Sequence, residues 1–376
     1  MIRPGATLGL LGGGQLGRMF TTRARSMGFD VWVLDPDPDS PAGGVASRHL
    51  QYHYDDPEGL ALLAEGCAAV TTEFENVPAQ TLDRLATRVR VSPSPASVAI
   101  AQDRIREKCF LQQHGIPTAP FTAIRTTTDL VAAWETIGAP ALLKTSRMGY
   151  DGKGQATITS LAELDAAWHR FGEVECVLER RLALELELSV VLARDDAGAM
   201  APYPVAENVH REGILFTSVV PARVDEAQAT AAVALSGRIA AALEYVGVLA
   251  VELFVADGGQ LFANELAPRP HNSGHYTIDA CTTDQFEQQV RTLCGLPLGA
   301  TGLLSPVCMV NLLGDLWRDG EPAWEQALAM PGVKLHLYGK RVPRPGRKMG
   351  HLCALAPSAS EAELLAHRSY ALVSRC

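Results

Sequence analysis

Two apolar segments joined by a glycine turn constrain the fold of this chain most strongly. Residues 251–255 and 260–266 each carry one glutamate, Glu252 and Glu265, among apolar neighbours. The connecting residues 256–259 end in two glycines, which supply the backbone freedom that a tight turn requires. If the segments pair antiparallel, the two carboxylates approach each other from neighbouring strands and repel unless a cation lies between them. The hairpin therefore predicts a cation site.

The ligand chemistry narrows the choice of cation. Hard oxygen ligands without Cys or His favour Mg²⁺ or Mn²⁺, which proteins usually share with a nucleotide phosphate. The polar run RPHNSGH at residues 269–275 follows the hairpin and adds anion-binding groups. The alternative is a surface hairpin with two solvated acids. Together with the polar run, the pair is interpreted as a metal–nucleotide site.

Length and charge exclude several classes of protein. A chain of 376 residues is long enough for two or three domains. Its net charge of −9 argues against binding to nucleic acid, so a local basic cluster has to hold any anionic ligand. The eight cysteines form no Cys-x-x-Cys pair, which indicates buried thiols and not disulfides or zinc ligands. No run reaches membrane-spanning length without charges, so we expect a cytoplasmic protein without a membrane partner.

The N-terminal residues read as an α/β unit with a parallel sheet. A strand at 6–11 leads through the turn GGGQLG at 12–17 into a helix, and a second strand follows at 29–34. The glycine spacing with Asp35 fits a dinucleotide fingerprint, so an NAD-binding Rossmann oxidoreductase is a rival interpretation. The sequence PDPD at 36–39 and the lack of a hydride-transfer constellation downstream disfavour it.

Further elements follow from turn signals and periodicity. The sequence SPSP at 92–95 marks a first domain boundary. The expected helices cover residues 96–114, 161–171 and 360–367, and the expected strands cover 141–145 and 156–158.

A glycine-rich loop at residues 149–155 is a second anion-binding candidate. Its three glycines allow it to close over a ligand, with its amides and Lys153 directed at phosphate. It lacks the spacing of a Walker A loop, and an ordinary flexible hairpin is the alternative. Lys144 ends the preceding apolar strand, where a lysine is costly unless it meets an anion. The two features together favour a phosphate site.

The ordered set of Lys144, GYDGKGQ, ERRL with Glu187, Glu252 and Asn264-Glu265 resembles the ATP-grasp superfamily. Within it, the chain is similar to the N5-carboxyaminoimidazole ribonucleotide synthase family. The matching segments run from Gly12 to Leu352: GGGQLGRM, TTEFENVP, QDRIREK, YPVAENVH, VGVLAVELFV, NELAPRPHNSGHY and YGKRVPRPGRKMGHL.

The resemblance implies an ATP-grasp fold of α/β and α+β type, with a Rossmann-like pre-ATP-grasp domain and a small C-terminal segment. The implied domains are residues 1–100, then 101–298 with a lid subdomain at about 118–177, then 299–376. The last segment is expected to complete the ribonucleotide site.

The resemblance also assigns site residues. Those implied for ATP are Arg104, Lys144, Gly149, Tyr150, Asp151, Gly152, Lys153, Gly154, Gln155, Glu179, Arg180, Arg181, Leu182, Glu187, His210, Asn264 and Glu265. Those implied for the ribonucleotide are Gln15, Leu16, Glu73, Asn272, Lys340, Arg347 and Lys348. Glu252 and Glu265 would hold Mg²⁺, or Mn²⁺. The catalytic candidates, for the bicarbonate pocket and the phosphates, are Tyr150, Lys153, Arg269, His271 and Lys348.

The implied activity is carboxylation of 5-aminoimidazole ribonucleotide by ATP and bicarbonate through carboxyphosphate, in purine biosynthesis. The implied partners are these small molecules, a second copy of the chain in a homodimer, and the mutase that takes the product. A formate-using ATP-grasp transformylase acting on glycinamide ribonucleotide is the near rival. A non-enzymatic nucleotide-binding module is the remote one, and the metal-acid pair speaks against it.

Overall fold

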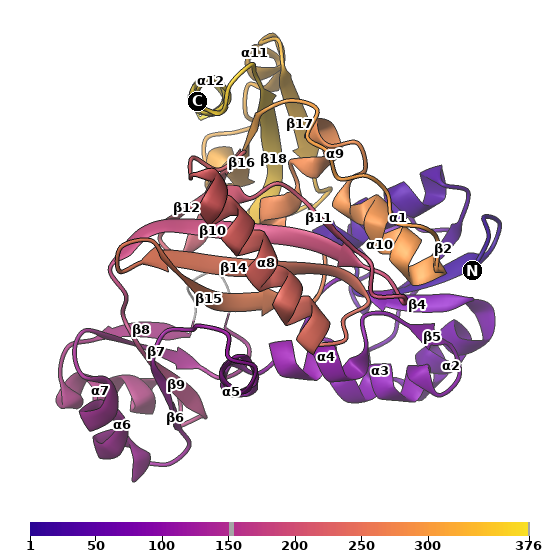
Figure 1. The fold of residues 1–376 in the computed structure, drawn as a ribbon. Coiled ribbons are helices and arrows are strands. Elements are labelled where there is room, and N and C mark those ends of the chain that lie inside the picture. The colour runs from indigo at the N-terminus through magenta and orange to yellow at the C-terminus, as the bar shows by residue number, and fades with distance from the viewer. Residues whose placement is uncertain (150–153, 375–376) are drawn as a thin grey trace.

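The computed structural model describes residues 1–149 and 154–374, which form three sheets with helices between and around them (Figure 1). The N-terminal sheet has the order β3-β2-β1-β4-β5, and its pairs are parallel, as the sequence predicts. Its elements are β1 (Thr7–Leu11), α1 (Gln15–Ser26), β2 (Asp30–Leu34), η1 (Gly43–Val45), β3 (Arg48–Leu50), α2 (Pro57–Gly66), β4 (Ala69–Thr72), α3 (Ala79–Ala86), β5 (Arg90–Val91) and α4 (Pro95–Ala101).

Asp35 stabilises the glycine turn of this sheet. Its Oδ2 accepts the amide N–H of Gly13 at 2.7 Å and the hydroxyl of Tyr54 at 2.7 Å. Gly12 has a φ of +98°, in the region that favours glycine. The carboxylate that a dinucleotide site would direct at a ribose is thus engaged with the protein itself.

A four-stranded antiparallel sheet of order β6-β9-β7-β8 forms a separate lobe, visible at the lower left of Figure 1. Its side chains form a core with those of α6 and α7. The elements of this region are α5 (Arg104–Gln113), β6 (Phe121–Ile124), α6 (Asp129–Ile137), β7 (Ala141–Thr145), β8 (Gln155–Ile158), α7 (Leu161–Arg170) and β9 (Cys176–Arg180).

The single helix predicted at residues 96–114 is wrong, because the chain forms two helices there. Asp103 has an extended backbone and accepts the amide N–H groups of Ile105 and Arg106. An aspartate in this position is an N-cap, which begins a new helix. Helix α5 therefore begins at Arg104, which lines the cavity described below.

The central sheet has the order β15-β14-β10-β12-β13-β16-β18-β17, and β11 pairs with β10. Its C-terminal strands therefore continue the sheet that carries the glutamate hairpin. The elements are β10 (Leu184–Arg194), β11 (Met200–Pro202), β12 (Ala206–Arg211), β13 (Ile214–Val220), α8 (Glu226–Ala242), β14 (Gly247–Ala256), β15 (Gln260–Ala267), η2 (Asn272–Gly274), α9 (Thr277–Ala280), α10 (Gln285–Cys294), β16 (Val307–Leu313), η3 (Gly314–Trp317), α11 (Trp324–Leu328), β17 (Val333–Leu337), β18 (Lys348–Leu355) and α12 (Ala359–Val373).

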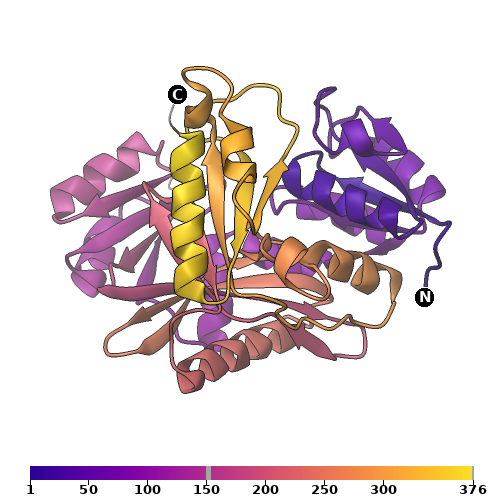
Figure 2. The ribbon, with the colours of Figure 1, turned by 90° about the horizontal axis from the view of Figure 1, so that it is seen from above.

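Helices α8 and α12 cover the central sheet, and α10 joins it to the N-terminal sheet. Helix α8 buries Leu235 and Ile239 against β10 and β14, and α12 packs on the C-terminal strands (Figure 2). Helix α12 runs beyond the predicted residues 360–367. Helix α10 contributes Phe286 and Val290 to the core of the N-terminal sheet, which fixes that sheet against the central one.

The structure bears on two expectations from the sequence: that the cysteines are buried thiols, and that no segment spans a membrane. The seven cysteines among the described residues are free, and all but Cys109 are buried. No helix in the described ranges is long and apolar enough to cross a membrane.

Candidate active site

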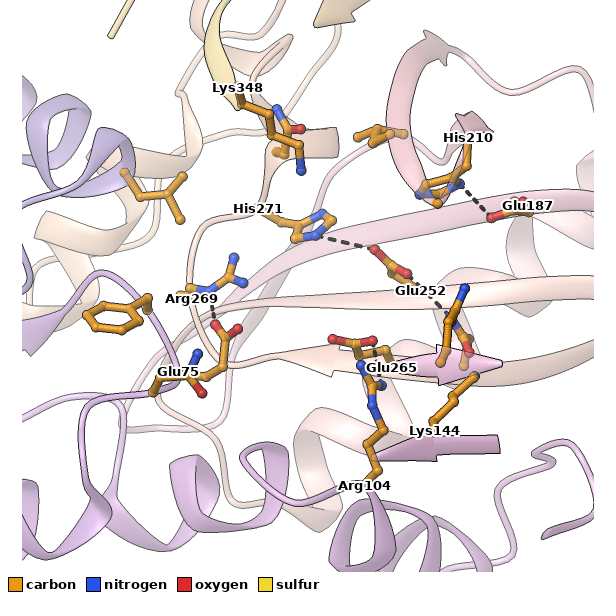
Figure 3. Close-up of a pocket in the computed structure, with 18 of the residues that line it drawn as sticks. Glu75, Arg104, Lys144, Glu187, His210, Glu252, Glu265, Arg269, His271 and Lys348 are labelled. Carbon is orange, nitrogen blue, oxygen red and sulfur yellow. Dashed lines mark hydrogen bonds and ion pairs between the residues drawn. The ribbon is translucent and has the colours of Figure 1, made fainter. Parts of the chain in front are cut away.

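A cavity of about 620 Å³ lies where the N-terminal sheet, the four-stranded lobe and the central sheet meet (Figure 3). It is lined by residues from all three regions, and many of them carry charge. The lining residues are Gln15, Leu16, Glu73, Phe74, Glu75, Asn76, Arg104, Leu142, Lys144, Gln155, Glu187, His210, Gly213, Leu215, Glu252, Phe254, Asn264, Glu265, Arg269, His271, Asn272 and Lys348.

The glutamate hairpin forms as predicted. Glu252 on β14 and Glu265 on β15 are direct partners in the antiparallel ladder, just before a register shift. Burial, followed by the charge of Glu265, raises the pKa of Glu252 above its ordinary value. Glu265 also forms an ion pair of 2.8 Å with Arg104, whose pKa it raises. The two acids thus face each other, with the Arg104 guanidinium paired to Glu265.

The donors around Glu252 suit a divalent cation. The side-chain oxygen of Asn264 is buried and has no hydrogen-bond partner among the described residues, while its amide nitrogen lies 3.4 Å from Glu252. Two carboxylates and an amide oxygen are the hard donors that Mg²⁺ prefers, with phosphate oxygens and water completing the shell. The residues present therefore fit a magnesium ion.

A second polar pair lies on the neighbouring strands. His210 on β12 forms an ion pair of 2.7 Å with Glu187 on β10. Burial lowers the pKa of His210, but the neighbouring carboxylate of Glu187 outweighs it and the net shift is upward. Phe254 and Leu142 line the same cavity and add apolar surface beside these polar groups. Such a mixture suits a base and a sugar with hydroxyl groups.

The ammonium group of Lys144 forms an ion pair with a carboxylate of the protein itself. Its ammonium group lies 3.0 Å from Glu179 on β9, and Lys108 on α5 lies 3.6 Å from the same oxygen. Burial alone would raise the pKa of Glu179, but the two lysines outweigh it and lower the pKa to about 2. Lys144 lines the cavity, whereas Glu179 lies behind it.

Glu73 holds the glycine turn at the cavity wall. Its carboxylate accepts the amide N–H of Gly14 and, at 2.7 Å, that of Gly17. Burial raises the pKa of Glu73, and the two amides partly offset this shift. Gln15 and Leu16 lie between those amides and line the cavity.

Arg269, His271 and Lys348 line the same side of the cavity (Figure 3). The guanidinium of Arg269 donates to Glu75 of the N-terminal sheet region. The ring Nε2 of His271 lies 3.3 Å from Glu252 Oε1. Burial, then the charges of Arg269 and Lys348, lowers the pKa of His271 well below its usual range, so its ring is neutral. These side chains place positive charge and N–H donors beside the acidic pair.

The structure brings most of the predicted site residues together. Those that do not line the cavity are Gly149, Gly154, Glu179, Arg180, Arg181, Leu182, Lys340 and Arg347. Lys340 donates to the carbonyl of Lys348 at 2.7 Å, and Arg347 donates to the carbonyl of Val342. The predicted roles of Tyr150, Asp151, Gly152 and Lys153 lie outside the described residues.

Several lining residues were not predicted from the sequence. They are Phe74, Glu75, Asn76, Leu142, Gly213, Leu215 and Phe254. The first three lie within four residues of the end of β4, and the end of a parallel strand is a usual place for ligand-binding residues. The apolar residues carry no such signal, since a strand residue facing a cavity looks like a core residue.

Three family models match consecutive parts of the chain. A ribonucleotide synthetase preATP-grasp domain matches residues 5–102, an ATP-grasp domain matches 109–286, and a phosphoribosylaminoimidazole carboxylase C-terminal domain matches 307–364. The three together span the sheets that enclose the cavity.

Relatives match over nearly the whole chain. N5-carboxyaminoimidazole ribonucleotide synthase of Brucella melitensis is 45% identical over 95% of this chain and 98% of its own. An ADP complex of N5-carboxyaminoimidazole ribonucleotide synthetase superposes with a TM-score of 0.93 and 41% identity, covering 98% of this chain and 97% of that one.

The enzyme of Aspergillus clavatus, solved in complex with ADP and 5-aminoimidazole ribonucleotide, gives a TM-score of 0.91 at 31% identity over 99% of each chain. Agreement in sequence and in fold extends across all three regions that build the cavity. The chain belongs to the N5-carboxyaminoimidazole ribonucleotide synthase family of ATP-grasp enzymes.

Proposed function

We propose that this chain carboxylates the amine of 5-aminoimidazole ribonucleotide, using ATP and bicarbonate and releasing ADP and phosphate. The product is N5-carboxyaminoimidazole ribonucleotide, an intermediate of purine biosynthesis. The observation that carries the proposal is the similarity over 99% of both chains to an enzyme solved with ADP and this ribonucleotide. The charged cavity at the junction of the three sheets supplies groups for each of the reactants.

The proposed reaction has two steps. A bicarbonate oxygen attacks the γ-phosphorus of ATP, the bond to the β-phosphate oxygen breaks, and ADP leaves, giving carboxyphosphate. The ribonucleotide amine then attacks the carboxyl carbon of carboxyphosphate, or of CO₂ freed from it, and loses a proton as phosphate departs. The protein contributes mainly positioning and charge neutralisation.

ATP is assigned to the side of the cavity formed by the four-stranded lobe and β10. Lys144 and Arg104 would contact the phosphates, as would Lys153 and the rest of the loop at 149–155. Glu187 and His210 would contact the sugar. Glu179 acts through Lys144, because their 3.0 Å ion pair holds the ammonium group in place. The adjoining Arg180, Arg181 and Leu182 would supply the backbone hinge for adenine.

The ribonucleotide is assigned to the opposite side, between the glycine turn and β18. Gln15, Leu16, Glu73 and Asn272 line that wall. Lys340, Arg347 and Lys348 would hold the 5′-phosphate, because arginine grips phosphate with two parallel donors and lysine adds a point charge. Arg269 and His271, with Tyr150, would hold bicarbonate and then carboxyphosphate.

Glu252 and Glu265, assisted by Asn264, would hold Mg²⁺, with Mn²⁺ as the substitute. The ion would neutralise charge on the ATP phosphates during transfer. The protein side of this arrangement is the ladder pairing of the two glutamates and the unpartnered oxygen of Asn264.

Release of ADP tests the function directly. The purified protein should release ADP at a rate that depends on both bicarbonate and 5-aminoimidazole ribonucleotide. Formate with glycinamide ribonucleotide should not support release, and activity with that pair instead would establish the transformylase. Isotope from labelled bicarbonate should appear in the ribonucleotide product. If ADP release is uncoupled from carboxylation, the product will carry no label.

The proposal also covers the cellular compartment and the protein partners of the enzyme. We expect the enzyme in the cytoplasm, because the seven cysteines among the described residues are free and mostly buried, which suits a reducing compartment. We expect a homodimer, and transfer of the unstable carbamate product to the mutase that follows. Light scattering and a coupled assay with that mutase would measure both.

A further inference from the structure

A buried chain of hydroxyl and amide groups ends on the ring of His271. The hydroxyl of Ser218 lies 2.7 Å from Asn208 Oδ1, and Asn208 Nδ2 lies 2.9 Å from the hydroxyl of Ser189. The hydroxyls of Ser189 and Ser273 are 2.7 Å apart, and that of Ser273 is 2.9 Å from His271 Nδ1. Five side chains are thus linked in one row.

The register of the central sheet explains why these groups meet. Asn208 on β12 is the ladder partner of Ser218 on β13, so their side chains share one face of the sheet. Ser189 on β10 is the partner of Ala206, two residues from Asn208, and also of Glu252 on β14. The row of hydrogen-bonded side chains therefore crosses three adjacent strands, on the face of the sheet that carries the acidic pair.

The side chains of this row are buried, so they hydrogen-bond to one another and not to water. Ser218 is 0% exposed, Ser189 and Ser273 are 1% exposed, and Asn208 is 7% exposed. Each of these groups needs its protein partner, because an unpaired buried hydroxyl or amide is costly. Proton placement in the row is therefore fixed by its neighbours.

The direction of the row follows from the backbone donor at its His271 end. The backbone N–H of Ser273 also points at His271 Nδ1, at 3.3 Å, and an amide N–H can only donate. Nδ1 is therefore an acceptor, and the hydroxyl of Ser273 donates to it. Each serine has a single proton, so Ser273 must accept from Ser189, and Ser189 must accept from the Asn208 amide. Every proton then points toward His271.

We infer that Ser273, through its backbone N–H and its hydroxyl, fixes His271 as the tautomer protonated on Nε2, and that Ser189, Asn208 and Ser218 are positioning residues that orient this hydroxyl. That N–H faces the cavity beside Glu252 Oε1, at 3.3 Å. Gln285 fixes the backbone of the same residue, since its Oε1 accepts His271 N–H at 2.9 Å and its Nε2 donates to His271 O at 2.8 Å. His271 thus presents a donor, and no acceptor, to a ligand in the cavity.

The consequence for catalysis rests on the proposed function. A donor fixed in a partly desolvated cavity suits an oxygen that gains or keeps negative charge, such as those of bicarbonate and carboxyphosphate. The opposite tautomer would present a lone pair to the same oxygen and repel it. The serine row would therefore raise the fraction of His271 that can bind the carboxyl group.

The tautomer is measurable without substrates. In ¹⁵N-labelled protein at neutral pH, long-range proton–nitrogen correlation should show His271 Nε2 protonated and Nδ1 bearing the lone pair. The signal is assigned by its loss in His271→Asn, since the chain has 10 histidines. A proton on Nδ1, or an equal mixture of tautomers, would overturn the inference even if the enzyme is an active synthase.

Removing a middle member tests the row itself. Ser189→Ala should shift the His271 ring toward a mixture of tautomers and lower kcat about tenfold, with the KM for ATP within about twofold. Ser236→Ala is the matched control, because Ser236 is also fully buried but its hydroxyl bonds to the carbonyl of Ala232 in its own helix. It should leave tautomer and kcat unchanged.

Ser189→Thr retains the hydroxyl and should restore both readouts. An unchanged tautomer in Ser189→Ala would overturn the role of the row. If Ser189→Ala does not fold, the measurement on the wild-type protein still decides the tautomer. If the wild-type protein shows the Nε2 tautomer but no carboxylation, the proposed function fails and the tautomer assignment stands.

Discussion

Glu252 and Glu265 face each other across adjacent strands of the central sheet, and the pKa of Glu252 is raised by burial and by its partner. Arg104 neutralises part of this negative charge through its 2.8 Å ion pair with Glu265. The protein thus keeps two acids close together, and their repulsion costs stability in the absence of a ligand. Such an arrangement is characteristic of a binding site.

The metal assignment predicts the effect of neutralising one acid. Glu265→Gln should fold normally but lower ADP release about a hundredfold, because a charge that holds the ion on the transferring phosphate is lost. The loss should grow as Mg²⁺ is made limiting. Glu185→Gln is the control, since Glu185 is exposed and contacts the turn of the same hairpin through Gly258 N–H. Normal turnover of Glu265→Gln at limiting Mg²⁺ would contradict the assignment.

The sequence predicts this hairpin well because its determinants are local. The turn residues 256–259 and the apolar alternation around each glutamate lie within a few residues of each other, and they set the pairing of Glu252 with Glu265. The parallel N-terminal sheet follows from the same kind of local signal. The break at Asp103 was missed because helical periodicity continues through it, and only the capping geometry ends the helix.

Contacts between distant residues could not be predicted. The sequence indicates that Lys144 needs an anion. The anion found is Glu179, which lies 35 positions away in the chain and is shared with Lys108. The pair of Arg269 with Glu75 joins residues 194 positions apart. Spacing rules describe one element at a time, whereas these pairs depend on how the sheets are assembled.

The basic segment before β18 predicts how the ribonucleotide is selected. Arg347→Ala should raise the KM for 5-aminoimidazole ribonucleotide about tenfold, because a charge-assisted contact with phosphate is lost. The KM for ATP should change little, and the preference for the ribonucleotide over its nucleoside should fall. Arg344→Ala removes an exposed arginine of the same segment and serves as the control. A variant at Arg347 that weakens ATP instead would assign the segment to the other substrate.

The contact between Glu75 and Arg269 predicts a link between the N-terminal region and the bicarbonate site. Burial raises the pKa of Glu75, but Arg269 outweighs it, so the net shift is downward and the carboxylate is charged at neutral pH. Glu75→Gln should raise the KM for bicarbonate about tenfold, because Arg269 loses the partner that orients it. Glu65→Gln, which breaks an exposed ion pair with Arg88, should have no effect. An unchanged KM in Glu75→Gln would show that Arg269 holds its position without Glu75.

The buried ion cluster around Glu179 predicts a dependence of stability on pH. The pKa of Glu179 falls from its ordinary value of 4.5 to about 2 on folding, so the folded protein binds this proton less readily than the unfolded chain. The stabilisation is therefore present above pH 4.5 and is lost as the pH falls from there toward 2. At neutral pH, Glu179→Gln should lower the free energy of unfolding by about 3 kcal/mol, since it leaves Lys108 and Lys144 without their anion.

Urea unfolding of wild type and Glu179→Gln at pH 7 and at pH 3 measures this effect. The difference in free energy of unfolding between the two proteins should be smaller at pH 3. At that pH the Glu179 carboxylate has lost part of the stabilisation that it provides over a neutral amide. Glu175→Gln is the matched control, since it removes an exposed ion pair with Arg125 just before β9. A difference between wild type and Glu179→Gln that stays constant between the two pH values would show that the lysines do not lower the pKa of this carboxyl group on folding.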